Sequence, residues 1–191
     1  LSELRNSLIP SCLEAIKFNS NRQLKILKTF EFGKIYKPIK DDFKESKLLS
    51  ISLTGNVFED NWNVKQQPDT FFYFKGIIEM MLTNKINKWE EKFVENKTFQ
   101  DGLEYMINDE KIFEFGYLSK RLLDFYSIKE TVIYGQLHLD SVSKYLTDKV
   151  YFKNIGKFPM IKRDFSLLVN QNVHFKDIKL LAESTEKNIL K

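Results

Sequence analysis

The stretch LEYMINDEKIFEFGY, residues 103–117, decides the fold class of this chain. Two runs within it, 103–107 and 112–117, are rich in apolar and aromatic residues and are typical of β-strands. The polar stretch between them, 108–110, has the length of a hairpin turn. Because strands joined by a tight turn must run antiparallel, this region predicts an antiparallel sheet rather than a doubly wound parallel one.

Strands and helices follow one another on both sides of this hairpin. Residues 49–54 alternate strictly between apolar and hydroxyl side chains, which predicts a strand with one buried face. Further strands are predicted at 27–36 and 131–136, helices at 11–19, 71–84, 119–126 and 140–146, and loops at 37–47 and 61–69. We therefore expect an α+β domain, with a largely antiparallel sheet flanked by helices.

Composition is that of an ordinary globular protein. The 191 residues carry 30 Lys or Arg and 26 Asp or Glu, a net charge of +4, and 42% are hydrophobic. This balance excludes a disordered chain, and the charge is too small to imply nucleic acid by itself. No apolar run approaches the roughly 18 residues that span a bilayer, so we expect no membrane association. The single cysteine, Cys12, excludes an internal disulfide and favours the reducing cytoplasm.

Residues that could carry chemistry are few. The glycine clusters of phosphate-binding loops are absent, and the two histidines, His138 and His174, are about 36 residues apart, which excludes a two-histidine metal face on one helix. We interpret His138 as a polar residue at a strand-to-helix corner, His174 as one at a helix start, and Cys12 as a buried helix residue. The acidic pair at 90–91 is interpreted as solvated surface. The sequence therefore predicts no catalytic residue and no metal site.

Basic residues lie beside aromatic ones most densely at Lys157–Arg163. Cations beside rings on which bases can stack are what a binder of single-stranded RNA requires. The same pattern also arises where lysines at strand ends are solvated, and composition alone favours that interpretation.

Segments spread over nearly the whole chain together resemble one family, the beta subunit of bacterial phenylalanine-tRNA ligase. Residues 5–13 and 30–36 are similar to its RxSLLPGLL helix and LFEIGKVF strand. Residues 71–79 and 135–139 are similar to its DFFDLKGxxE helix start and GELHP corner. Residues 157–169 resemble the KFPAxRRDLALLV strand that opens its anticodon-binding domain, and this match is the most specific.

The resemblance implies two domains. Residues 1–152 would form a catalytic-like core of the class II aminoacyl-tRNA synthetase type, and residues 153–191 would begin a ferredoxin-like anticodon-binding domain. Only one strand, 164–170, and one helix, 175–190, of that second module are expected, so we expect it to be incomplete.

The resemblance also implies that this part of the subunit is not catalytic. Class II chemistry needs an arginine on the central strand to bind the α-phosphate of ATP. Residues 30–33 offer Glu31 at that place, and residues 135–139 contain no arginine. The whole enzyme uses ATP and Mg²⁺, but this fragment is expected to bind no cofactor, and no metal ligand is implied for it.

The implied role is that of a scaffold. It would dock on the alpha subunit of phenylalanine-tRNA ligase, in an assembly of two alpha and two beta subunits, and help to place tRNA(Phe). By family analogy Arg5 and Pro10, at the first helix, are candidate subunit-interface residues, and a capping or core role is equally compatible with them.

Candidate tRNA contacts lie in the densest basic stretch. They are Lys157, Lys162 and Arg163, although Arg163 could instead form a local structural pair with Asp164. A rival hypothesis from another class is an autonomous RNA-binding module that uses Lys157–Arg163.

Overall fold

The computed structural model describes residues 4–24, 26–40, 42–55, 70–83, 85–86, 88–146, 164 and 166–186. The chain divides into two compact units, 1–149 and 150–191. The loop predicted at 61–69 lies outside the described residues. In the part of the chain that is described, no helix is long and apolar enough to cross a membrane.

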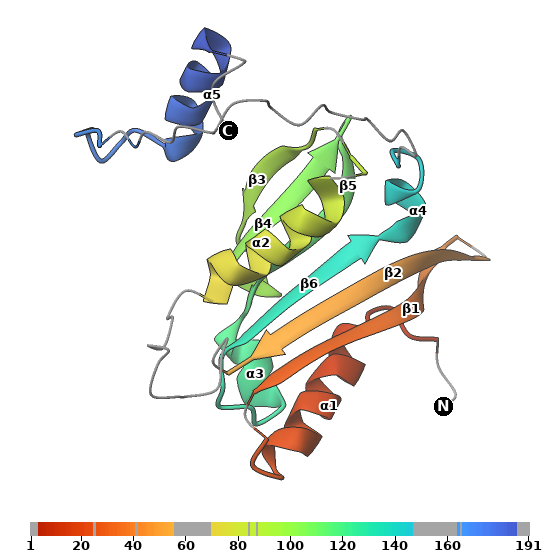
Figure 1. The fold of residues 1–191 in the computed structure, drawn as a ribbon. Coiled ribbons are helices and arrows are strands. Elements are labelled where there is room, and N and C mark those ends of the chain that lie inside the picture. The colour runs from red at the N-terminus through yellow and green to blue at the C-terminus, as the bar shows by residue number, and fades with distance from the viewer. Residues whose placement is uncertain are drawn as a thin grey trace, which may run out of the picture. The chain divides into compact units, whose positions relative to one another are not determined.

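The first unit is built on one six-stranded sheet (Figure 1). Along the sheet the strands follow the order β1-β2-β6-β5-β4-β3, and every neighbouring pair is antiparallel. The strands are β1 (Leu27–Ile39), β2 (Asp42–Thr54), β3 (Glu90–Val94), β4 (Phe99–Ile107), β5 (Glu110–Leu118) and β6 (Val132–His138). The predicted antiparallel sheet of an α+β domain is therefore confirmed.

The turn between β4 and β5 has two residues, one fewer than the predicted turn at 108–110. Asn108 and Asp109 both have positive φ, 49° and 61°, and Glu110 already belongs to β5. A two-residue loop with positive φ at both positions matches the twist of the strands it joins, and Asn and Asp tolerate that conformation well. The conformation of these two turn residues thus fixes which residues of β4 and β5 pair next to the turn.

The loop predicted at 37–47 is wrong, because β1 and β2 form one long hairpin through this region. Lys37 pairs with Lys44, and the Nζ atom of Lys34 lies 2.8 Å from Oε1 of Glu45 across the strands. Charged residues are compatible with a strand that extends into solvent, since pairing between strands outweighs the weak intrinsic preference of each residue.

The sequence pattern does not predict strand β3. Its residues Glu90 and Glu91 were interpreted as solvated surface, yet Glu91 accepts a hydrogen bond of 2.8 Å from Nζ of Lys75, a half-buried helix residue. Short edge strands rich in charge carry a weak sequence signal, because only one of their sides is paired.

Helices cover both faces of the sheet. They are α1 (Ile9–Ser20), α2 (Thr70–Thr83), α3 (Lys120–Phe125) and α4 (Leu139–Val142). Ile133 packs in the cluster under α2, while its neighbours Val132 and Tyr134 pack with α1 and α3. Because successive strand residues point to opposite faces, α2 and α1 lie on opposite sides of the sheet (Figure 1).

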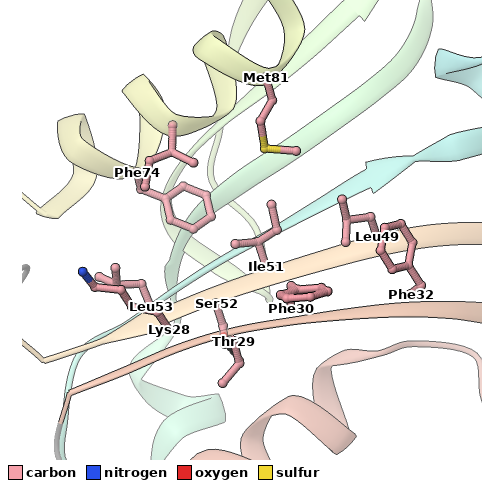
Figure 2. Close-up of a pocket in the computed structure, with 11 residues that line it drawn as sticks. Lys28, Thr29, Phe30, Phe32, Leu49, Ile51, Ser52, Leu53, Phe74 and Met81 are labelled. Carbon is pink, nitrogen blue, oxygen red and sulfur yellow. Dashed lines mark hydrogen bonds between the residues drawn. The ribbon is translucent and has the colours of Figure 1, made fainter.

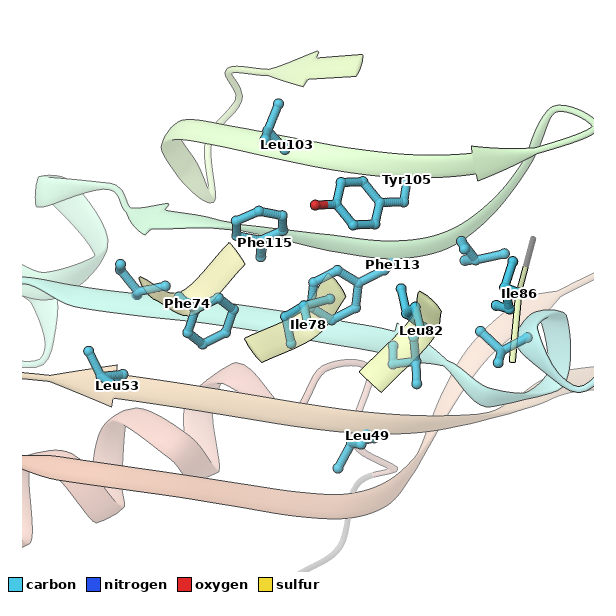
Figure 3. Packing of buried hydrophobic residues seen from close by; sticks show 14 residues of the cluster. Leu49, Leu53, Phe74, Ile78, Leu82, Ile86, Leu103, Tyr105, Phe113 and Phe115 are labelled. Atoms are coloured by element: carbon cyan, nitrogen blue, oxygen red, sulfur yellow. The ribbon is translucent and has the colours of Figure 1, made fainter. Parts of the chain in front are cut away.

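The larger core lies between α2 and the sheet (Figure 3). Helix residues Phe74, Ile78 and Leu82 pack on strand residues such as Phe113 and Phe115. These five side chains are at most 4% exposed. The apolar spacing that predicted a helix at 71–84 thus matches the face that α2 buries.

The second unit contains α5 (Phe175–Thr185) but no described strand. The strand predicted at 164–170 is wrong for residues 166–170, which adopt no regular structure, and none of the residues of α5 is buried. A strand needs a neighbour to satisfy its backbone groups, and the described residues supply none. The described residues of this unit do not confirm the incomplete ferredoxin-like segment expected here.

Candidate functional site

Arg5, a predicted interface residue, joins the segment before α1 to strand β1. Its Nη1 atom lies 2.6 Å from Oε1 of Glu31, and its Nε donates to the Lys34 carbonyl oxygen over 2.8 Å. The Arg5 carbonyl in turn accepts the Tyr36 N–H at 2.9 Å. Gly33 makes the approach possible, because a Cβ atom there would lie 2.5 Å from Nη2 of Arg5. Arg5 thus holds its segment against the outer edge of β1.

Pro10, the other predicted interface residue, is exposed in the first turn of α1. Proline suits this place because the first N–H groups of a helix have no partner within the helix. The helix begins at Ile9, two residues before the predicted start, and the Ser11 hydroxyl lies 2.9 Å from Oε2 of Glu31.

The placement of Glu31 on a central strand is wrong. Glu31 lies on β1, an edge strand whose only described neighbour is β2. A glutamate on β1 therefore does not by itself report the loss of an ATP-binding arginine. The loss of an ATP-binding arginine is instead supported by the whole sheet, because none of the six described strands carries an arginine.

A row of polar side chains crosses the sheet on the α1 side. It runs from Glu31 through Ser50 and Gln136 to Glu114 and Glu104, on five neighbouring strands. With three carboxylates in the row, these side chains do not fit the phosphates of ATP, which bind where fixed cations or free backbone N–H groups converge. The five described side chains of this row therefore supply no cation of their own for a phosphate.

Glu114 is the most strongly perturbed carboxyl of this row. Burial alone would raise its pKa, but hydrogen bonds and the charge of Lys111 outweigh burial and lower the pKa to about 2. The Lys111 Nζ atom lies 2.8 Å from Oε2, and the Gln136 side-chain amide donates to Oε1. The His138 side chain, whose Nε2 atom lies 3.7 Å from Oε1, is the largest cause that lowers this pKa, followed by Lys111 and Gln136.

This lowered pKa predicts a specific loss of stability in acid. A group with a lower pKa in the folded state stabilises the fold above its unfolded pKa, near 4.5, and loses that contribution as the pH falls toward 2. The contribution is on the order of 3 kcal/mol. Urea unfolding at pH 7, 5 and 3 should show a steep fall in the wild-type chain and a shallower one in Glu114→Gln. Equal slopes would contradict the assignment.

The remaining sequence candidates are His138, His174, Cys12 and the three basic residues at 157–163. His138 ends β6 immediately before α4, at the predicted strand-to-helix corner, and His174 precedes α5 in an exposed position. Cys12 is buried, and burial raises the pKa of its thiol, which makes it a poor nucleophile. Within the described part of the chain no group of three or more His, Cys, Asp or Glu could hold a metal ion. Lys157, Lys162 and Arg163 lie outside the described residues.

The opposite face of the sheet contains an apolar hollow that the sequence did not reveal (Figure 2). Its volume is about 330 Å³, and it lies between α2 and strands β1 and β2. Phe30 and Phe32 of β1 border it with 72% and 66% of their surfaces exposed. Its lining residues are Lys28, Thr29, Phe30, Phe32, Leu49, Ile51, Ser52, Leu53, Phe74, Ile77 and Met81. The alternation of aromatic residues on β1 was the available signal, but it cannot tell a buried face from an open one.

The arrangement of the sheet and helices matches that of known synthetases. Two solved structures of pyrrolysyl-tRNA synthetase from Desulfitobacterium hafniense align with 73% of this chain, each with a TM-score of 0.56. They are 14% and 15% identical in sequence, and the alignments cover 48% and 47% of those chains. The chain therefore has the fold of the class II tRNA synthetases.

The sequence comparison identifies the family within this class. The chain belongs to the family described as the phenylalanyl tRNA synthetase beta chain CLM domain, whose model matches residues 1–139. Phenylalanine–tRNA ligase beta subunits from Bacteroides thetaiotaomicron, Fusobacterium nucleatum and Streptococcus mutans are each 29% identical to it. These alignments cover 100%, 96% and 100% of this chain and 25% of each relative. The chain thus spans about a quarter of the length of these relatives.

Proposed function

We propose that this chain is part of a phenylalanine–tRNA ligase beta subunit and serves there as a non-catalytic scaffold. The observation that carries the proposal is the match of residues 1–139 to the beta-chain CLM family. The whole enzyme would join phenylalanine to its tRNA with ATP and Mg²⁺, in the cytoplasm. This chain would supply a folded sheet domain and none of the reacting groups.

The non-catalytic part of the proposal is supported by the side chains of the sheet. Neutralising the charge that develops during adenylate formation requires fixed cations near the phosphates. The described strands carry no arginine, and the cations beside the polar face, Arg5 and Lys111, are already paired with Glu31, Glu104 and Glu114. These residues do not fit ATP, so we assign no step of the reaction to them.

The scaffold role also involves partners. The chain would associate with the alpha subunit, in an assembly of two alpha and two beta subunits, and help to place tRNA(Phe). Pro10 stays a candidate contact because it is exposed, whereas the internal bonds of Arg5 favour its structural role. Lys157, Lys162 and Arg163 stay candidate tRNA contacts. The rival hypothesis of an autonomous RNA-binding module has no support in the named relatives, which are ligase subunits.

Coexpression with a phenylalanine-specific alpha subunit tests the proposal directly. The two chains should elute together on sizing, with a mass by light scattering above that of either chain alone. The purified chain alone should give no ATP–pyrophosphate exchange, while an alpha–beta enzyme serves as the positive control. Exchange by the chain alone would refute the non-catalytic assignment, and separate elution would refute the docking role.

A further inference from the structure

Strand β1 presents an edge that is partly filled by its own chain. The Tyr36 N–H donates to the Arg5 carbonyl, and the Lys34 carbonyl accepts from Arg5 Nε, so both residues direct their backbone groups away from β2. In an antiparallel pair this direction alternates along the strand with a period of two. Phe30 and Phe32 have the same parity and therefore direct their N–H and C=O groups outward as well.

The outward groups of Phe30 and Phe32 have no backbone partner among the described residues. Two N–H donors and two C=O acceptors thus lie in a row beside the apolar hollow. The two rings are packed edge to face, with centroids 6.1 Å apart, and stand at the border of that hollow opposite Met81 (Figure 2). Main-chain groups that can pair with another strand therefore lie beside a pocket that can take an apolar side chain.

The rest of the sheet's edges are protected. Arg5 occupies β1 at Lys34–Tyr36, and Pro38, farther along the same edge, has no N–H to donate. The opposite edge strand, β3, has only five residues, of which three are charged. Short and charged edges resist the addition of another strand. The open edge is thus concentrated at Phe30–Phe32.

We propose that an extended segment of another polypeptide adds to β1 along Phe30–Phe32 and places an apolar side chain in the hollow. Strand addition of this kind derives affinity from main-chain hydrogen bonds and specificity from pockets for alternate side chains. A second copy of this chain is a poorer occupant. The exposed parts of the two rings amount to about 300 Å², so a stable dimer would need surface beyond the open edge to reach about 800 Å² from each partner. The proposal does not depend on the ligase role.

Amide hydrogen exchange of the full 191-residue chain, followed by NMR, tests this proposal. The probe is an eight-residue peptide that alternates valine and threonine and has a lysine at each end. The amides of Phe30 and Phe32 should exchange quickly in the free chain and at least tenfold more slowly with saturating peptide. The Glu31 amide points toward β2 and should be protected in both states, which makes it the internal reference.

Variants and a modified peptide separate the possible outcomes. Phe30→Ser with Phe32→Ser should weaken peptide binding at least tenfold, whereas Phe93→Ser, at an exposed phenylalanine on β3, should change it less than twofold. A peptide N-methylated at its valines should bind at least tenfold more weakly, because it lacks the donors.

Four results would overturn the proposal. The first is protection of the Phe30 and Phe32 amides in the free chain, which would mean that the chain fills its own edge. The second is protection that rises with protein concentration together with dimer in sedimentation, which would identify a second copy as the occupant. The other two are equal binding of the N-methylated peptide and no added protection at saturation.

Discussion

Replacing Gly116 by alanine is expected to destabilise the chain by about 3 kcal/mol, the upper end of the usual cost of overpacking. Gly116 lies on β5, where an added Cβ would collide with the Asp101 carbonyl oxygen of β4 and come within 2.7 Å of the Gly102 Cα atom. Both obstacles are backbone atoms, so no rotation of a side chain can relieve the collision. The two strands would have to separate and lose hydrogen bonds around the Gly102–Gly116 pair.

Gly76→Ala provides the matched control for this prediction. Gly76 is exposed on α2, and no atom lies within 4 Å of the position that its Cβ would take. Alanine is preferred over glycine in a helix by about 1 kcal/mol, so this variant should be slightly more stable than the wild type. Urea unfolding followed by circular dichroism measures both variants. A Gly116→Ala chain as stable as the wild type would contradict the strand packing.

Phe113→Ala is expected to cost about 3–5 kcal/mol of unfolding free energy, because it leaves a cavity in the centre of the core. Phe113 is fully buried under α2, with its ring centroid 5.5 Å from that of Phe115 and 6.0 Å from that of Tyr105. The ring fills the space that Gly135 leaves open on the neighbouring strand, because a Cβ atom at Gly135 would lie 2.8 Å from Cζ of Phe113.

An exposed phenylalanine is the control for this second prediction. Phe93 on β3 is 88% exposed, so Phe93→Ala should change the stability by no more than about 0.5 kcal/mol. Chemical denaturation of the two variants under identical conditions gives the comparison. Similar losses of stability in both would show that Phe113 does not have the central place in the core described above.

Local patterns predicted most of the elements of the first unit. The strand predicted at 49–54 lies within β2, and the polar turn at 108–109 joins β4 to β5. These patterns are readable because the period of a strand and the chemistry of a tight turn depend on neighbours in sequence. The predictions failed at 37–47, at β3 and at 166–170, where strand formation depends on pairing with another segment and not on the residues of the segment itself. The single buried face predicted for 49–54 is wrong, because Ser50, Ser52 and Thr54 are buried as well, under the helices of the opposite face.

The candidate site likewise combines features that the sequence indicates with features that depend on tertiary contacts. Arg5 was recognised as a residue of interest from the resemblance, but its bonds to Glu31 and Lys34, 26 and 29 positions away, had no signature in the sequence. The position of β1 at the edge of the sheet was likewise invisible. It overturned the expectation that Glu31 lies on a central strand, because strand order is a property of the assembled sheet.

The sequence by itself determined the class of fold, the periodicity of its main elements and, through its motifs, the family. Only the tertiary structure decided which strand has an open edge, which aromatic residues are exposed there, and which charges neutralise one another. The reason is physical: propensity and turn geometry act over a few residues, whereas burial and pairing arise only when distant segments share one sheet.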